Sequence, residues 1–133
     1  MTNDQLITEA KEAMKKAYTP YSKFNVGCAL LLNDGSVVHG ANIENASYGL
    51  SNCAERSALF AAFSKGYRKD DIIKMAIVGD TDSFISPCGA CRQVISELVN
   101  EETEIILTNM HDVTKTLDKK ELLPFSFSEA DLT

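Results

Sequence analysis

The sequence has no long hydrophobic run, no excess of basic residues and no glycine-rich phosphate loop, and each absence excludes a class of function. No stretch among the 133 residues approaches the roughly 20 apolar residues that a membrane-spanning helix needs. Thirteen basic against nineteen acidic residues give a net charge of −6, so nucleic acid and anionic membranes are poor partners. Without a GxGxxG or Walker-type loop, dinucleotide and triphosphate cofactors are not expected. The nearest approach to a GxSxG nucleophile motif, Gly49 to Cys53, fails at its last position.

The amino-terminal segment also lacks the pattern of a secretory signal, because acidic and basic residues are mixed from Asp4 to Lys16. We therefore expect a cytoplasmic protein. In that reducing compartment, four cysteines are more often metal ligands, nucleophiles or core residues than disulfides. The length suits a single domain over residues 1–133, and the 44% apolar content allows a core to form.

Hydrophobic periodicity predicts short strands that alternate with helices. An α/β sheet covered by helices follows, with an antiparallel hairpin at its start. The tail is expected to hold a strand near Val113 and a short helical turn before Pro124. The predicted elements before the tail are a helix behind a Thr2 or Asn3 cap that ends before Pro20, strands Val26–Leu32 and Val37–His39, a helix from Cys53 to Gly66, a strand Met75–Val78, a helix Gly89–Val99 and a strand Glu104–Leu107.

A CxxC motif, Cys88 to Cys91, stands at the start of a predicted helix directly after Pro87. Residues three apart share a helix face, so both thiols can reach one metal ion. Taken alone, the motif fits a redox pair, half of a structural zinc site or two buried thiols without a role.

A second motif, Cys53-Ala54-Glu55, adds a third thiol at another predicted helix start, with an acid two residues on. Helix N-termini favour thiolates, because their unpaired N–H groups carry partial positive charge. Three protein ligands with an acid beside them fit an open catalytic zinc site better than a closed structural one.

Together the two motifs resemble the signature of zinc-dependent deaminases in its three-cysteine form. The wider stretches 42–48, 53–56 and 86–93 resemble the small homotetrameric cytidine deaminases, and the resemblance extends over nearly the whole chain. Cysteine at the first ligand position points away from deaminases that use histidine there, such as those acting on tRNA, nucleotides or polynucleotides. The resemblance implies a three-layer α/β/α sandwich with a mixed central sheet. It also implies pyrimidine salvage, in which cytidine and deoxycytidine are converted to uridine and deoxyuridine with release of ammonia.

The resemblance assigns one Zn²⁺ per chain to Cys53, Cys88 and Cys91, and proton transfer to Glu55. Zinc lowers the pKa of a bound water from about 15.7 toward 7, which makes hydroxide available at neutral pH. Glu55 would take the proton of this water, give it to ring N3 and later help to protonate the departing amine. A buried carboxylate has the raised pKa that such shuttling needs. Arg56 either offsets the negative charge of the thiolates by donating to them or is an ordinary surface arginine.

Substrate contacts also follow from the resemblance. Asn42 and Glu44 would hold the ribose hydroxyls, Phe24 would pack on the base, and Ala54 would belong to the same pocket. Asn42 and Glu44 alternate on an extended segment, so their side chains would point the same way. The other reading makes these two residues turn-forming polar residues and Phe24 a core phenylalanine.

The predicted helix from Cys53 to Gly66 is apolar on more faces than a domain of this length can cover. We therefore expect part of this helix to be buried against another subunit. The resemblance implies a homotetramer in which Tyr48 and Phe125 of neighbouring subunits reach the pocket.

Two alternatives remain open. The first is a deaminase of another aminopyrimidine nucleoside, such as blasticidin S, because that family is similar around the zinc motif. The stretch 42–48 and the position of Phe125 favour cytidine.

The second alternative is a non-catalytic zinc module in which Cys28 completes a four-cysteine site. It leaves Glu55 without a purpose and requires a strand cysteine to reach two helix starts. Outside this alternative, Cys28 is predicted to lie in the core, His39 in a strand and His111 in a loop.

Overall fold

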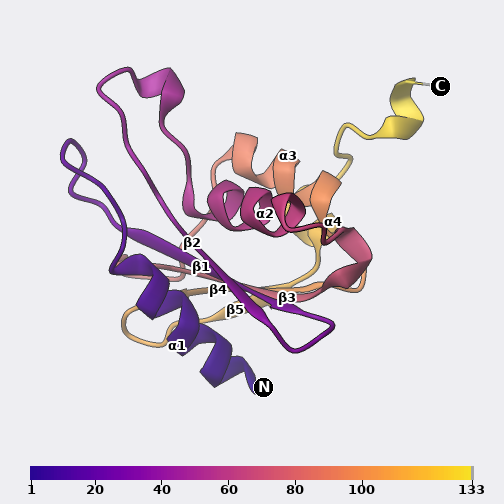
Figure 1. The fold of residues 1–133 in the computed structure, drawn as a ribbon, viewed down its shortest axis with the longest axis horizontal. Helices are drawn as coiled ribbons and strands as arrows, with labels where there is room; N and C mark the ends of the chain where they lie inside the picture. Colours follow the sequence, from indigo (N-terminus) through magenta and orange to yellow (C-terminus); the bar gives the residue numbers. More distant parts are fainter. Residues whose placement is uncertain (133) are drawn as a thin grey trace.

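A computed structural model describes residues 1–132, and Thr133, the last residue of the predicted domain, lies outside the described part. Within that range, five strands form one sheet with helices on both faces (Figure 1). No helix of residues 1–132 combines the length and the hydrophobicity that crossing a bilayer requires. The elements are α1 (Asn3–Met14), β1 (Val26–Leu32), β2 (Val37–Ala41), η1 (Tyr48–Leu50), α2 (Ala54–Ser64), η2 (Lys69–Asp71), β3 (Ile72–Gly79), α3 (Gly89–Leu98), β4 (Glu104–Asn109), β5 (Lys115–Leu117), α4 (Lys119–Leu122) and η3 (Glu129–Leu132).

The sheet is mixed, with strand order β2-β1-β3-β4-β5. β1 pairs antiparallel with β2 and with β3, and β5 pairs antiparallel with β4. β3 and β4 run parallel, and such a pair needs a crossover connection, which α3 provides. The predicted mixed sheet with an opening antiparallel hairpin is therefore confirmed.

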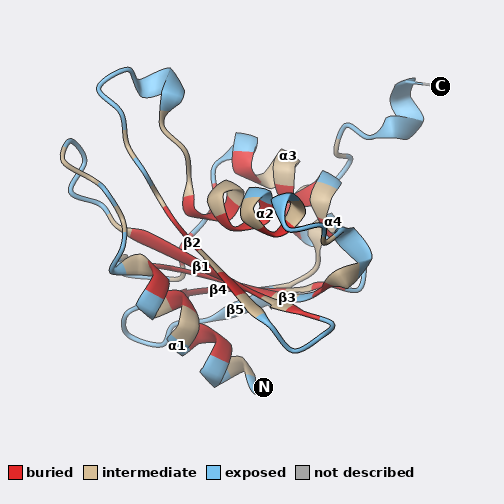
Figure 2. Cartoon of the chain, viewed as in Figure 1, coloured by how far each residue is buried: buried red, intermediate tan, exposed pale blue. Residues whose placement is uncertain are grey.

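Helices cover both faces of this sheet, with α1 on one side and α2 and α3 on the other (Figure 1). Successive residues of a strand point to opposite faces, so β1 contributes to two separate cores. Cys28 and Leu30 pack among the residues on the α2 and α3 side, whereas Ala29 packs with Leu6 and Ala10 of α1. Figure 2 shows the buried residues along the strands and on the helix faces turned toward them. The three-layer prediction is confirmed, and Cys28 is a core residue as expected.

The first helix begins and ends as predicted, but it is shorter than its apolar spacing. Thr2 is its N-cap, in a capping box with Gln5, and the helix ends at Met14, before Pro20, although the apolar spacing continues to Ala17. The chain leaves the helix because it pairs with a distant segment: the backbone N–H of Tyr18 donates to the carbonyl of Asn42 at 2.9 Å. The apolar spacing of the sequence carries no signal for this long-range pairing.

Other boundaries shift by a few residues. β2 continues to Ala41, which pairs with Gly27, and His39 lies within this strand as predicted. The tail strand predicted near Val113 is present as β5, which begins at Lys115. The N–H of Val113 itself donates to the side chain of Asn109 at 2.9 Å. The predicted helical turn before Pro124 is present as α4.

Candidate active site

Two cysteines stand at helix starts, as the sequence predicts. Cys53 is the N-cap residue of α2 and Cys88 is the N-cap residue of α3. The Sγ atom of Cys88 accepts a hydrogen bond from the backbone N–H of Cys91 at 3.5 Å. The starts of two helices therefore present three thiols, where the unpaired N–H groups of a helix carry partial positive charge.

Cys53, Glu55 and Cys91 place one potential ligand atom each within 4.8 Å of one another. The Sγ atoms of Cys53 and Cys91 are in direct contact, while their Cα atoms are 7.2 Å apart. Native disulfides usually have Cα separations of about 4.4–6.8 Å, so the separation here is wider than is usual for one. Two cysteines are not part of the ligand group found among residues 1–132: Cys28, as expected, and Cys88, which was predicted to be a ligand and is exposed.

These groups open into a cleft of about 230 Å³ at the starts of α2 and α3. Four residues of its wall were not anticipated: Val26, Ile85, Ser86 and Pro87. The only signal for the last two was their position next to the CxxC motif. The predicted site residues that line the cleft together are Phe24, Asn42, Cys53, Ala54, Glu55, Cys88 and Cys91.

Glu55 is the buried acid of the cleft, with 4% of its surface exposed. Burial raises the pKa of Glu55, and its own backbone N–H and the charge of Arg56 act weakly in the opposite direction. A carboxyl group whose pKa is raised by burial holds a proton more readily than a solvated one, which suits proton transfer.

Arg56 contacts a thiol rather than lying loose on the surface. Its Nε donates a hydrogen bond to Sγ of Cys53 at 3.1 Å, and the side chain is partly buried. A hydrogen bond from a guanidinium to a thiolate is charge-assisted. Of the two readings that the sequence leaves open for Arg56, this contact favours the donor to the thiolates.

Asn42 lies at the wall of the cleft with its side-chain amide bonded to backbone. Its Oδ1 accepts from the N–H of Val26 at 2.9 Å, and its Nδ2 donates to the carbonyl of Phe24 at 2.7 Å. The side chain therefore fixes the segment that brings Phe24 into the cleft. Local sequence patterns could not have indicated these two contacts.

Glu44 does not line the cleft as it stands. Its Oε1 accepts the backbone N–H groups of Tyr21 and Ser22, each at 3.1 Å. Hydrogen bonds from Ser22, through its side chain and its backbone, are the main cause that lowers the pKa of Glu44, with further contributions from Tyr21 and Lys23. Asn42 and Glu44 thus hold the same loop from two positions.

Two predicted site residues lie away from the cleft of their own chain. Tyr48 is 73% exposed on the η1 arm, where its ring packs edge-on against Tyr21 at a centroid distance of 6.3 Å. Phe125 is fully exposed, with a φ of 55°, in the segment after α4. The loop that carries η1 and the C-terminal segment, residues 123–132, both extend away from the sheet beyond α2 and α3 (Figure 1). Neither residue closes the pocket of the chain that carries it.

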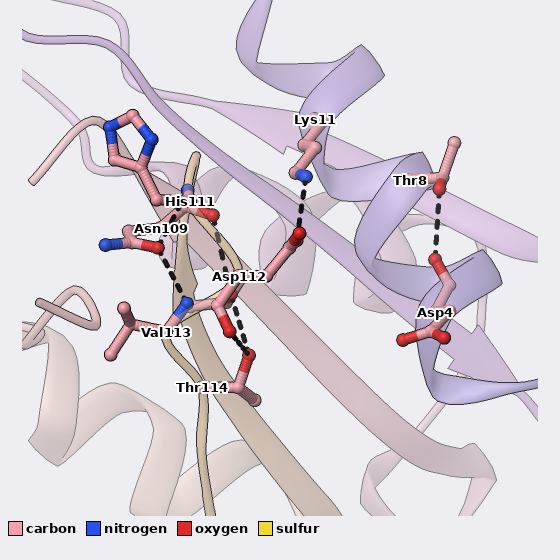
Figure 3. Close-up of polar contacts among 9 residues, drawn as sticks. Asp4, Thr8, Lys11, Asn109, His111, Asp112, Val113 and Thr114 are labelled. Atoms are coloured by element: carbon pink, nitrogen blue, oxygen red, sulfur yellow. Dashed lines mark hydrogen bonds and ion pairs between the residues drawn. The ribbon is translucent and has the colours of Figure 1, made fainter.

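The loop between β3 and Cys88 is held by Asn109, a buried residue at the end of β4. Its Nδ2 donates to the carbonyls of Thr81 at 2.9 Å and Asp82 at 3.2 Å. Its Oδ1 accepts the backbone N–H groups of His111 and Val113, both at 2.9 Å (Figure 3). His111 is a loop residue, as predicted. The role of Asn109 was not predicted, because the only sign of it in the sequence is a polar residue near the end of a strand.

The depth at which α2 sits on the sheet is set by Gly40. A Cβ atom at this position would lie 2.4 Å from the backbone N of Ala58 and 2.5 Å from the carbonyl oxygen of Ala54. Backbone therefore rests against backbone beneath the first turn of α2. That turn carries Glu55 and follows directly on Cys53.

The donor set suits zinc, which is bound in proteins by thiolate and imidazole ligands. Cys53, Glu55 and Cys91, with Cys88 in the same cleft wall, provide donor types that zinc sites use. By contrast, the larger hollow of about 630 Å³ next to the C-terminal segment is lined by lysine, glutamate, serine and apolar side chains and contains no cysteine or histidine.

Comparison with known proteins agrees with this geometry. Residues 1–112 match the family model of the cytidine and deoxycytidylate deaminase zinc-binding region. The chain is 52% identical over 132 residues to a cytidine deaminase of Halalkalibacterium halodurans, covering 99% of this chain and 98% of that protein. It is 50% identical over 134 residues to a cytidine deaminase of Sporosarcina psychrophila, covering 100% and 96% of the two chains.

The fold has a solved counterpart in the crystal structure of a cytidine deaminase from Burkholderia pseudomallei. That structure superimposes with a TM-score of 0.93 at 54% sequence identity, and it covers 96% of this chain and 100% of its own. The resemblance stated from the motifs is therefore confirmed over the whole fold. The chain belongs to the family of zinc-dependent cytidine and deoxycytidylate deaminases.

Proposed function

We propose that this chain catalyses the hydrolytic deamination of cytidine and deoxycytidine to uridine and deoxyuridine in pyrimidine salvage. The observation that carries the proposal is the grouping of Cys53, Glu55 and Cys91 within 4.8 Å at the starts of two helices, inside a cleft. The relatives that match over nearly their full lengths are named cytidine deaminases. A cytoplasmic location fits this role in nucleoside salvage.

Cys53, Cys88 and Cys91 would hold one Zn²⁺ per chain. When bound, the ion supplies Lewis acidity, which lowers the pKa of a water molecule beside the substrate. Cys88 is the most exposed of the three cysteines, and it stands in the cleft wall with its Sγ at the start of α3.

Glu55 would move the protons. It takes one proton from the attacking water and gives it to ring N3 as the oxygen bonds to C4. It then takes the remaining proton of the hydroxyl added at C4 and delivers it to the exocyclic amine, so that the C4 carbonyl forms as the C4–N bond breaks and ammonia leaves. Burial raises the pKa of Glu55, which is the direction that helps a carboxylate to accept a proton and hold it until it is passed on.

Arg56 would balance the thiolates. Its hydrogen bond to Sγ of Cys53 places a fixed cation beside a cluster of negative ligands. Three thiolates around a divalent ion leave an excess of negative charge, which opposes the acidification of water. The guanidinium offsets part of this excess.

Substrate binding would use residues that already order the cleft. Phe24 packs on the base and Ala54 lies beside it, while Asn42 and Glu44 take the ribose hydroxyls. Both backbone bonds to Glu44 end on the same oxygen, Oε1, and an ionised carboxylate has further acceptor capacity. The charge of Glu44 beside the sugar would also repel a 5′-phosphate.

A homotetramer would complete the pocket. The cleft of a single chain is smaller than the roughly 300–1,000 Å³ that is common for ligand sites. Tyr48 and Phe125 lie exposed outside it, and Phe60 of α2 is 45% exposed. Neighbouring chains would supply Tyr48 and Phe125 as the missing walls and would cover the outer face of α2.

The direct test is ammonia release from a panel of cytidine, deoxycytidine, CMP, adenosine and blasticidin S by the purified protein. Release from the two free nucleosides, with little or none from CMP and adenosine, is expected. Faster turnover of blasticidin S than of cytidine would replace the proposed substrate with the alternative aminopyrimidine. Comparable kcat/KM for CMP and cytidine would refute the pocket described for the ribose.

A further inference from the structure

Arg92 directly follows the CxxC motif, and its guanidinium donates hydrogen bonds to two separate segments: the turn before Cys88 and the end of α4. Nε donates to the carbonyl of Pro87 at 2.8 Å, and Nη2 donates to Oγ of Ser86 at 2.6 Å. Nη1 donates to the carbonyl of Leu122 at 2.7 Å. Among residues 1–132, these three recorded acceptors are all uncharged. The contribution of Arg92 is therefore geometrical rather than the pairing of charges.

Two of these acceptors lie immediately before the proposed ligand Cys88. The carbonyl of Pro87 belongs to the peptide group whose nitrogen is that of Cys88. Because this group is planar, holding its oxygen also fixes the plane from which the Cα of Cys88 continues. Proline has no N–H of its own with which to anchor the segment. Arg92 thus fixes, by a hydrogen bond, the peptide group directly before Cys88.

The third acceptor provides the fixed support. Leu122 is buried and is the last residue of α4, and Lys119 at the start of α4 donates to the carbonyls of Ser96 and Val99 at 2.8 and 2.9 Å. α4 is therefore fastened to the far end of α3. Through Leu122, Arg92 ties the turn before Cys88 to an element that is itself bound to the same helix.

We propose that Arg92 is a positioning residue that holds the Pro87–Cys88 peptide against the end of α4 and so retains zinc at Cys88. The inference rests on the proposed role of Cys88 as a ligand. Only arginine carries donors in a rigid planar fork that can reach three oxygens at once. Lysine supplies one ammonium, and glutamine supplies a single amide.

The experiment compares Arg92→Gln and Arg92→Lys with the wild-type holoenzyme. The rate of zinc release to a chromogenic chelator is measured well below the unfolding temperature, and the unfolding temperature of each protein is recorded. Removing a residue that supports a metal ligand typically weakens metal binding by about 10–100-fold. We expect at least a tenfold faster release from Arg92→Gln and an intermediate rate from Arg92→Lys.

Two matched variants separate positioning from general destabilisation. Arg68 also donates to backbone, to the carbonyls of Phe63 at 3.1 Å and Tyr67 at 2.7 Å, but at the end of α2 away from the cysteines. Gln93 is the neighbour of Arg92. Its side-chain Nε2 donates to the carbonyl of Phe127 in the C-terminal segment at 2.8 Å. Arg68→Gln and Gln93→Ala should release zinc at the wild-type rate.

Equal acceleration in Arg92→Gln and Arg68→Gln would overturn the proposal, because general loosening of the fold would explain both. Acceleration in Gln93→Ala equal to that in Arg92→Gln would assign the effect to the C-terminal segment instead. Cys88→Ala serves as the reference for the ligand itself. If Cys88→Ala retains zinc as the wild type does, the ligand assignment fails. If Cys88→Ala loses zinc while Arg92→Gln keeps the wild-type release rate, the positioning role alone fails.

Discussion

Replacing Gly40 with alanine tests whether the sheet sets the position of the active site. The added Cβ would lie 2.4 Å from the backbone N of Ala58, 2.5 Å from the carbonyl oxygen of Ala54 and 2.8 Å from the Cα of Ala58. All three atoms belong to the backbone of α2, so rotation of a side chain cannot relieve the contact. The helix has to move away from β2, and Cys53 and Glu55 have to move with it.

The size of the effect follows from these distances. Favourable contacts between heavy atoms lie at about 3.5–4.0 Å, so the first turn of α2 must shift outward by roughly 1 Å. Forcing one extra methyl group into a packed interior costs about 1–3 kcal/mol of stability. Misplacing a catalytic group by about 1 Å can cost on the order of a hundredfold in rate. We expect Gly40→Ala to combine both losses and to hold zinc less tightly.

The assay is kcat/KM for cytidine together with zinc content and the unfolding temperature, at a temperature where the variant remains folded. Gly49→Ala is the matched control, because a Cβ at Gly49 meets no atom within 4 Å. It should behave as the wild type. A folded Gly40→Ala protein with more than about a third of the wild-type kcat/KM would refute the claim that this contact sets the geometry of the site.

Three further predictions concern single side chains. Cys28→Ser should leave zinc content unchanged, because Cys28 lies in the core outside the ligand group; reduced zinc would revive a four-cysteine site. Arg56→Ala should lower the deamination rate at neutral pH more than Arg56→Gln does, and equal rates at equal zinc content would make Arg56 merely structural. Asp34 has a pKa lowered to about 2 by hydrogen bonds from Ser36 and Tyr67. Its charged form therefore stabilises the fold above the unfolded-state pKa of about 3.9, and this contribution is lost as the pH falls through 2. Asp34→Asn should be less stable than the wild type to urea at pH 7, with a difference that shrinks below pH 4; a constant difference would contradict the assignment.

Much of the chemistry could be predicted from the sequence because it depends on local spacing. Cys53 and Cys88 each precede a helical pattern, so their position at helix starts follows from short-range rules that the structure bears out. Short apolar runs likewise predicted the first four strands of the central sheet, and the turn residues 33–36 predicted the hairpin of β1 and β2. The full order β2-β1-β3-β4-β5 comes from the structure.

What could not be predicted depends on contacts between distant segments. Asn42 accepts a hydrogen bond from the backbone N–H of Val26, 16 residues away, and Glu44 accepts one from that of Tyr21, 23 residues away. Arg92 reaches Leu122 across 30 residues. None of these contacts leaves a periodic trace, because each depends on how the finished fold brings polar groups together. Asn42 nevertheless holds Val26 and Phe24, two residues of the cleft wall.

The central claim is that Glu55 carries the protons for deamination at a zinc held by cysteines. The most direct measurement is the rate of ammonia release from cytidine by Glu55→Gln, compared with wild type at equal zinc content. Glutamine keeps the shape of the side chain but cannot carry protons, and general acid–base catalysis is typically worth about 10²–10⁴-fold. We predict a loss of at least about a hundredfold with fold and zinc unchanged. A variant that retains more than a tenth of the wild-type rate would contradict this role for Glu55.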